Sequence, residues 1–348
     1  MNRSRPVAGN LKRLVLCIAA LGACSDALDQ DTTAGQAVVV VNEGSGDATV
    51  VDATRLTTTS FSLAAGVPTG VDARGPDLVV TLGDSDAVQV ATTAGAGSVI
   101  PLAGGSGAAG VAIDNDSIVW VASPGVDRVA YVNYRTGDTA SFPTGPYPRA
   151  VLLTAEDVLV INSNFAGGQA FGASSVRWIR RAEGIRSFGT IPLSCTNARF
   201  GALGGDGFVY VVCAGTPDSA DGKLAIVDPA ARAEVAVLNG LGESPGPAVY
   251  HPSGRLLMAS ASEGILEVNA TTRSIVRGPG QGTRPENDGI DALVVDTRGR
   301  VFAVARRTCT GPGAVHVLTA PPDYRLIETI PVGECPSAAV LAGVAPSP

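Results

Sequence analysis

A recurring pattern of short apolar runs, most of them rich in β-branched residues, constrains the fold of this 348-residue chain more than any other feature. Seven such runs occupy residues 38–41, 78–80, 118–121, 158–161, 208–212, 256–258 and 301–304. Turns rich in Gly, Asp, Asn or Pro precede them, as at residues 114–116, 204–207 and 252–254. Short strands with frequent turn signals indicate an all-β fold.

The strands also have a longer period. The segments before the turns begin near Val67, Gly107, Tyr147, Thr196, Gly246, Gly289 and Pro336, at spacings of 40 to 50 residues. Each unit has room for four strands, and the third strand tends to end in an Asp or Asn, as at Asp52, Asn133, Asp228 and Asn269. Four strands in about 44 residues form the repeating unit of a β-propeller blade.

The two ends of the pattern complete each other. The first unit begins at Gln36 with what should be a second strand, and residues 336–342 read as a first strand with nothing after it. Joined, they complete a seventh blade and leave no exposed sheet edge. The sequence therefore predicts an all-β, seven-bladed β-propeller of four-stranded antiparallel blades. Residues 37–348 form this single domain, and the C-terminal strand closes the ring on the N-terminal blade.

Two segments allow a family resemblance to be named. Residues 133–137 with 145–148, and residues 227–229 with 237–238, resemble the YVTN/NHL-type propeller repeat. The resemblance extends over residues 37–344. It implies a fold and says little about function, because propellers host many unrelated sites.

The first residues read as an export signal. Arg3, Arg5, Lys12 and Arg13 precede a short apolar run over residues 14–21. Eight helical residues cover about 12 Å, too little for a hydrocarbon core of roughly 30 Å. A basic segment followed by a short apolar run is typical of a secretory signal peptide.

The signal ends Leu21-Gly22-Ala23-Cys24, which resembles a bacterial lipobox. The resemblance implies cleavage before Cys24, lipidation of that cysteine and stable membrane anchoring by several acyl chains. Residues 1–23 would then be the signal peptide and residues 24–36 a lipidated tether. Ser25 favours the outer membrane, so we expect a lipid-anchored protein of the bacterial cell envelope. Ordinary cleavage near Ala23 is the alternative.

Four cysteines remain for the exported chain besides Cys17 and Cys24, namely Cys195, Cys213, Cys309 and Cys335. An even number in an oxidising compartment indicates disulfides, with three possible connectivities. The blade register brings Cys195 close to Cys213 and Cys309 close to Cys335, so we expect these two pairs. A metal site of reduced thiols is the alternative, but the chain lacks a C-x-x-C spacing.

Charge and composition exclude some functions. The chain has 25 basic and 32 acidic residues, a net charge of −7 and two histidines. Without a basic surface we expect no nucleic-acid partner. Residues 285–291 resemble a strand start of gluconolactonase-like propellers, where Asp288 would be a metal ligand. The corresponding segments 335–337 and 246–248 lack the Glu and Asn that such a metal also needs, so Asp288 and Asp291 could instead be turn and strand residues.

No complete catalytic group emerges, and we expect neither a metal nor another cofactor. Trp120 and Trp178 do not recur in register, as the docking motifs of quinoprotein propellers would. We therefore predict a binding or protein-interaction scaffold, with an envelope protein or a small ligand as its partner, and a monomer. The alternative is a metal-dependent gluconolactonase-like hydrolase or a redox enzyme with its site at the channel mouth.

The candidate binding residues lie in loops and strand starts. Asn164 and Phe165 belong to a long loop at residues 162–172, Arg149 and Arg199 start two blades, and Asp288 precedes another. Recognition usually resides in such loops on a rigid scaffold. In the alternative interpretation, Phe165 covers the core of its own loop and the arginines pair with nearby acids.

Overall fold

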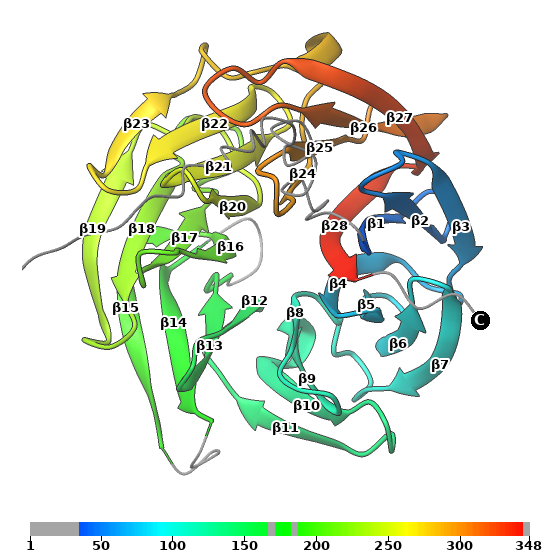
Figure 1. Ribbon diagram of the computed structural model, residues 1–348. Helices are drawn as coiled ribbons and strands as arrows, with labels where there is room; N and C mark the ends of the chain where they lie inside the picture. Colours follow the sequence, from blue (N-terminus) through cyan, green and yellow to red (C-terminus); the bar gives the residue numbers. More distant parts are fainter. Residues whose placement is uncertain (1–34, 166–170, 182–186, 344–348) are drawn as a thin grey trace, which may run out of the picture. The chain divides into compact units, whose positions relative to one another are not determined.

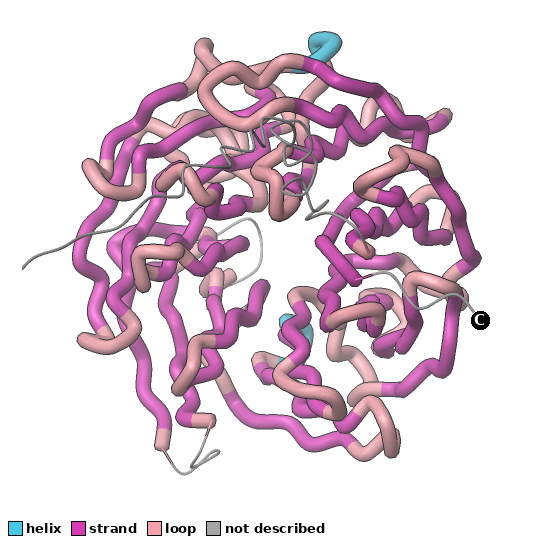
Figure 2. The backbone as a smooth tube through the Cα atoms, in the orientation of Figure 1, coloured by secondary structure: helices cyan, strands magenta, loops and turns pink. Residues whose placement is uncertain are grey.

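The computed structural model describes residues 35–165, 171–181 and 187–343. These belong to one compact unit, Thr33–Pro348, and contain seven four-stranded antiparallel sheets. The sheets follow one another around a central axis (Figures 1 and 2). The prediction of a seven-bladed β-propeller is confirmed.

Each blade is named by its place in the ring and is given from its innermost strand outwards. Blade 1 consists of β28 (Pro336–Gly343), β1 (Gln36–Asn42), β2 (Asp47–Asp52) and β3 (Thr58–Ser62). Blade 2 consists of β4 (Pro68–Arg74), β5 (Asp77–Leu82), β6 (Ala87–Thr92) and β7 (Gly95–Pro101). Blade 3 consists of β8 (Val111–Ile113), β9 (Ile118–Ser123), β10 (Arg128–Asn133) and β11 (Thr139–Pro143). Blade 4 consists of β12 (Pro148–Leu153), β13 (Asp157–Asn162), β14 (Ala173–Arg180) and β15 (Phe188–Thr196).

The remaining blades follow the same order. Blade 5 consists of β16 (Ala198–Leu203), β17 (Val209–Cys213), β18 (Lys223–Asp228) and β19 (Ala233–Asn239). Blade 6 consists of β20 (Ala248–His251), β21 (Arg255–Ser260), β22 (Gly264–Asn269) and β23 (Ser274–Arg277). Blade 7 consists of β24 (Ala292–Val295), β25 (Val301–Ala305), β26 (Pro312–Leu318) and β27 (Leu326–Glu334). Among the described residues, the short 3-10 turns η1 (Pro124–Val126) and η3 (Pro285–Asn287) lie in connections.

Strand β28 closes the ring as the sequence predicts. It pairs antiparallel with β1, with Gly343 opposite Gln36 and Ala338 opposite Val41. The last inner strand of the chain thus belongs to the blade that starts it, and in Figure 1 the red β28 lies beside the blue β1.

Packing between blades explains the apolar runs of the sequence. In β1, Val38, Val39, Val40 and Val41 are all fully buried. A second strand contacts the neighbouring blade on each of its two faces, so its residues are continuously apolar and do not alternate. Among the described residues, seven apolar clusters each join two adjacent blades around the ring.

The two faces of the ring differ in their turns. On the face that carries the turns between third and fourth strands, an Asp or Asn side chain closes each of several turns. Asp52 Oδ1 accepts the backbone N–H groups of Thr54 and Arg55 at 2.8 Å, and Asp228 Oδ1 accepts those of Ala230 and Ala231. These are Asx turns, which explains why several third strands end in Asp or Asn.

The opposite face carries the loops between second and third strands and the segments leading from one blade into the next; we call it the connection face. Here acidic side chains bind the next blade. Asp86 accepts the backbone N–H groups of Gly105 and Gly107 at 2.7 Å. Asp127 accepts that of Tyr147 at 2.7 Å, which fixes the start of blade 4.

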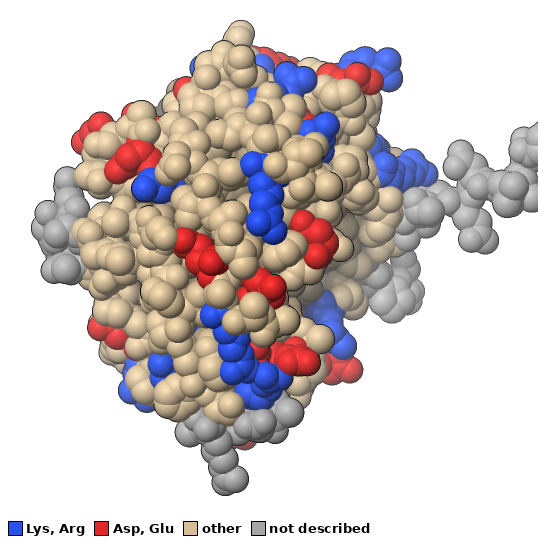
Figure 3. All heavy atoms as spheres, turned by 90° about the vertical axis from the view of Figure 1, so that its left-hand side faces the viewer, with Lys and Arg blue, Asp and Glu red and all other residues tan. Residues whose placement is uncertain are grey.

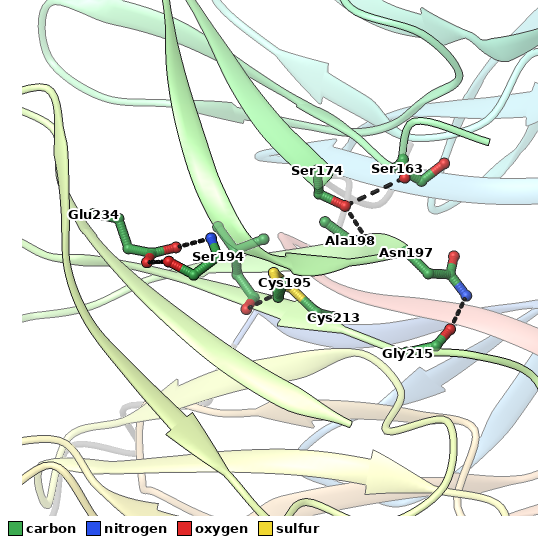
Figure 4. Close-up of a disulfide and its surroundings, with 10 residues drawn as sticks. Ser163, Ser174, Ser194, Cys195, Asn197, Ala198, Cys213, Gly215 and Glu234 are labelled. Atoms are coloured by element: carbon green, nitrogen blue, oxygen red, sulfur yellow. Dashed lines mark hydrogen bonds between the residues drawn. A yellow bond between two sulfur atoms is a disulfide. The ribbon is translucent and has the colours of Figure 1, made fainter. Parts of the chain in front are cut away.

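Both predicted disulfides are present. Cys195 on β15 is bonded to Cys213 on β17, and Cys309, after β25, is bonded to Cys335, just before β28. Each therefore joins neighbouring blades, and the second ties the closing strand to blade 7. Figure 4 shows the first disulfide among the hydrogen bonds of Ser174, Ser194 and Asn197.

The predicted signal peptide at residues 1–23, the predicted lipidation site Cys24 and the tether up to residue 34 lie outside the described residues. The other end of the predicted tether, residue 36, is the first residue of β1. Within the described ranges, no helix has the length and apolar character needed to cross a membrane.

Candidate functional site

Three adjoining cavities open along the axis and at the connection face. Two have volumes of about 310 Å³ each, and the third has about 230 Å³. The first is lined by the inner strands of blades 1 to 5, and the second by the starts of the inner strands. Arg149 and Arg199 line all three, so they stand where the channel meets its side cleft.

A β-bulge in each inner strand places these arginines. In β12 the pairing with β13 shifts between Pro148 and Ala150, which leaves Arg149 as the additional residue. In β16 the shift between Ala198 and Phe200 does the same for Arg199. A bulge turns a side chain out of the regular alternation along a strand. Here the two bulged residues are Arg149 and Arg199, whose side chains line the channel.

The same local geometry recurs in other blades. Thr69 is the additional residue of β4, and Ser337 lies in the bulged start of β28. Tyr147, Asn197 and Cys335, each two residues before the bulge, have left-handed φ angles of 53° or 54°. A proline directly precedes each of the residues Thr69, Arg149 and Ser337. The residue after a proline at the start of an inner strand is therefore a sequence signal for these positions at the mouth of the channel.

Neighbouring backbone fixes the arginines further. The N–H of Gly110 donates to the carbonyl of Arg149 at 3.0 Å, and a Cβ on Gly110 would lie 2.5 Å from that oxygen. Asn197 Nδ2 donates to the Gly215 carbonyl at 2.9 Å, and Ser174 Oγ accepts the N–H of Ala198 at 3.0 Å (Figure 4). Both arginines therefore stand on rigid, packed strands.

Among the described residues, neither arginine has an acidic partner or a side-chain hydrogen bond. Arg149 lies over the Tyr147 ring at 5.7 Å and Arg199 over the Phe200 ring at 5.4 Å. Burial and the charge of Arg149 lower the pKa of Arg199. Two half-buried guanidinium groups that repel each other constitute an unsatisfied set of hydrogen-bond donors facing a cavity.

The other side of the mouth is electrostatically balanced. Asp291 Oδ1 lies 3.4 Å from Arg306 Nε, and the Arg306 N–H donates to Asp291 Oδ2 at 2.9 Å. Burial raises the pKa of Asp291, even though the N–H and charge of Arg306 act to lower it. The binding residues expected from the sequence do not include Thr69, Ser337 or Arg306. Asp291 is expected from the sequence only as a turn or strand residue.

The third cavity is an aromatic cleft beside the arginines. Its lining includes Tyr147, Phe165 and Phe171. Ring centroids are 5.0 Å apart for Tyr147 and Phe165, and 5.0 Å apart for Phe165 and Phe171. Asn164 Nδ2 donates to the Ala173 carbonyl at 2.9 Å, so this side chain holds the loop together.

Asp288 lies in a different environment from that implied by the gluconolactonase resemblance. None of the three cavities is lined by it. Its Oδ2 accepts from Arg307 Nε at 2.9 Å and lies 2.9 Å from His316 Nε2. Burial acts to raise the pKa of Asp288, but the hydrogen bonds from Arg307 and His316 outweigh it and hold that pKa below its usual value.

Glu286, Asp288 and His316 are the one set of described residues whose ligand atoms come within 4.8 Å of one another, as a metal ion would require. Arg307 pairs with both carboxylates, however, through Nη2 to Glu286 and Nε to Asp288 at 2.9 Å each. A cation would have to displace this guanidinium, so the donor set fits an ion-pair network better than a metal.

Figure 3 shows how charges are distributed on one side of the molecule. On the side shown in Figure 3, acidic and basic side chains lie in small mixed groups on a mostly uncharged surface. Because both signs are mixed, this side presents no extended field of one sign.

Comparison with known proteins bears on the fold. No family model matches the chain, and no curated protein matches it. A solved structure of a functionally unknown protein from Desulfotomaculum acetoxidans has a TM-score of 0.66 at 12% identity, over 89% of this chain and 99% of that one. Hydrazine synthase of Kuenenia stuttgartiensis has a TM-score of 0.64 at 12% identity, over 78% and 88%. Virginiamycin B lyase of Staphylococcus aureus has a TM-score of 0.58 at 11% identity, over 85% and 88%. Such distant similarity shows the shared propeller fold, and the roles of these proteins are diverse.

Proposed function

We propose that this protein is an exported, lipid-anchored binding module of the bacterial cell envelope, which takes its ligand at the connection-face mouth of the channel. The observation that carries the binding part is the pair Arg149 and Arg199, which share three cavities and lack acidic partners among the described residues. Stability alone gives no reason to retain two such charges next to each other, whereas a binding site does.

The proposed location in the cell envelope rests on the sequence and is consistent with the disulfides. Cys24 follows a lipobox-like segment, and two disulfides suit an oxidising compartment. We also propose that the chain is related to the YVTN/NHL-type propellers and that its lipid anchor lies in the outer membrane.

The binding experiment uses the lipidated full chain purified in detergent. Immobilised wild type is incubated with envelope extract, and retained small molecules and proteins are identified by mass spectrometry. We expect a species that is retained by wild type and by Arg325→Ala but is lost by Arg149→Ala/Arg199→Ala. Arg325 is an exposed arginine of the β26–β27 turn on the other face and serves as the matched control.

Equal retention by wild type and the double variant would remove the mouth as the binding site. Labelling of growing cells with a radioactive fatty acid tests the proposed lipid anchor, since wild type should incorporate the label and Cys24→Ala should not. Stoichiometric divalent metal with lactone turnover lost in Asp288→Ala would favour the enzymatic alternative.

A further inference from the structure

We infer that the channel mouth binds a small aromatic oxyanion, with its carboxylate or phosphate group between Arg149 and Arg199 and its ring in the cleft of Tyr147, Phe165 and Phe171. This inference rests on the proposed function and names the class of ligand for that site. It follows from three observations on charge, shape and donor chemistry.

The charge around the mouth favours an anion on one side only. Blades 4 and 5 contribute Arg149 and Arg199, neither of which is neutralised by a described acid. On the other side, Asp291 is neutralised by Arg306, and Glu43 adds an exposed carboxylate. The chain as a whole has a net charge of −7, so this positive spot contrasts with its surroundings. An anion is therefore directed towards blades 4 and 5.

The donor chemistry favours an oxyanion. A guanidinium group offers five N–H donors in a planar fork and has no acceptor. Two such forks at one cavity match a carboxylate or a phosphate, which can accept several hydrogen bonds at once. A bound oxyanion also relieves the repulsion between the two arginines, whereas a neutral ligand leaves it in place.

The cleft next to the arginines favours a single ring. Its volume of about 230 Å³ compares with the roughly 150 Å³ apolar cavity that accepts benzene. The three aromatic side chains present ring faces and edges, and a further ring can pack on them edge-to-face or offset. The arginines line the same cleft, so an oxyanion one or two atoms away from the ring can contact both parts.

Calorimetric titration of the detergent-purified lipidated chain tests the inference with five probes: phenylacetate, phenyl phosphate, phenylacetamide, acetate and inorganic phosphate. We expect phenylacetate or phenyl phosphate to bind at least about tenfold more tightly than phenylacetamide and than the matching ring-free anion. Which of the two binds more tightly distinguishes a carboxylate source from a phosphate source. Arg149→Ala and Arg199→Ala should each weaken that binding by at least about tenfold.

Two controls separate the contributions. Arg325→Ala should bind like wild type. Phe165→Ala should weaken the aromatic anion and leave inorganic phosphate unchanged, since the ring contact alone is lost. Thermal unfolding verifies folding, and Arg199→Ala should melt no lower than wild type because it removes a half-buried charge that has no acidic partner among the described residues.

Equal affinity for phenylacetate, phenyl phosphate and phenylacetamide, or undiminished affinity in both arginine variants, would overturn the oxyanion assignment. Binding of ring-free anions as tight as that of their aromatic counterparts would overturn the ring assignment. If no probe binds while the envelope experiment still retains an arginine-dependent species, the ligand class is wrong and the proposed function stands. If neither experiment gives an arginine-dependent signal, both fail.

Discussion

Burial of one carboxyl group on an inner strand links the stability of the ring to pH. Asp72 lies half-buried on β4, and its Oδ2 accepts the N–H of Ile113 on β8 at 2.7 Å. Burial raises the pKa of Asp72 to about 6, although hydrogen bonds from Ile113 and Ala73 act to lower it. Asp72 therefore joins two blades while its charged form remains unfavourable.

The sign of the pH effect follows. Between the unfolded pKa near 4 and the folded value of about 6, the folded chain binds the proton and the unfolded chain does not. The contribution of Asp72 is thus most favourable below the unfolded pKa and is lost as pH rises through this window. Asp72→Asn lacks this loss, so the unfolding free energy of the variant relative to wild type should rise from pH 4 to pH 7 by up to about 3 kcal/mol.

Urea unfolding at a series of pH values measures this difference. Asp52→Asn is the opposite control: burial acts to raise the pKa of Asp52, but hydrogen bonds from Arg55 and Thr54 lower it. Its contribution is present above the unfolded pKa near 4 and is lost as pH falls below that value. The stability of Asp52→Asn relative to wild type should therefore show no rise from pH 4 to pH 7 and should increase only below pH 4. A flat difference for Asp72→Asn would contradict the assignment.

At the same scale, the sequence indicated some of the mouth residues and missed others. Arg149 and Arg199 could be named because they begin strands in the repeat register. The pairing of Asp291 with Arg306, 15 positions apart in the chain, could not be read from sequence. Likewise Asp288 resembles a known metal ligand, but its environment depends on Arg307 in the loop after β25 and on His316 in β26.

At the scale of elements, the fold repeats a few local devices that the sequence does show. The third strands of blades 1, 3, 5 and 6 end in Asp or Asn because those side chains close the next turn. Second strands carry runs of apolar residues because both of their faces are covered. Strand bulges are different, since an additional residue in one strand becomes visible only against its partner. The bulges that accompany Arg149 and Arg199 therefore needed the structure, although the two residues could be named from the sequence.

The disulfide Cys309–Cys335 anchors the element on which ring closure depends. It closes a segment with a sequence separation of 26, and Cys195–Cys213 one of 18. Restricting the unfolded chain in this way contributes about 3 kcal/mol for each loop. Cys309→Ser/Cys335→Ser and Cys195→Ser/Cys213→Ser should therefore lower the unfolding free energy by similar amounts, about 2–4 kcal/mol.

Hydrogen exchange should separate the two variants. Without Cys309–Cys335, the amides of β28 should exchange faster, because Cys335 lies next to this strand. Without Cys195–Cys213, the amides of β28 should keep their protection, and the loss should fall on the interface of blades 4 and 5. Equal loss of β28 protection in both variants would show that closure does not depend on the local disulfide.

At the scale of the whole molecule, the ring consists of seven blade interfaces that each bury an apolar cluster. Opening any one interface exposes the apolar sheet faces that it buries, and such exposed patches favour aggregation. Blade 1 is special because its strands come from both ends of the chain. β28 and β1 are paired by hydrogen bonds but are not consecutive in the chain. The chain order can therefore be permuted at this point with the least change in contacts.

A circular permutant tests whether ring contacts, and not chain order, determine the fold. Gly343 lies opposite Gln36 in the β28–β1 register, so a short Gly-rich turn can join the two and form the same first hairpin as in the other blades. The permuted chain begins at Cys335, which keeps its bond to Cys309, and ends at Glu334. All seven interfaces survive, so its melting temperature should lie within a few degrees of the wild-type value.

A chain that ends at Cys335 and lacks β28 leaves β1 as an open edge of four buried valines and should aggregate or melt far lower. A permutant as unstable as that truncation would mean that the order of synthesis directs closure, and that the ring contacts alone do not specify the fold.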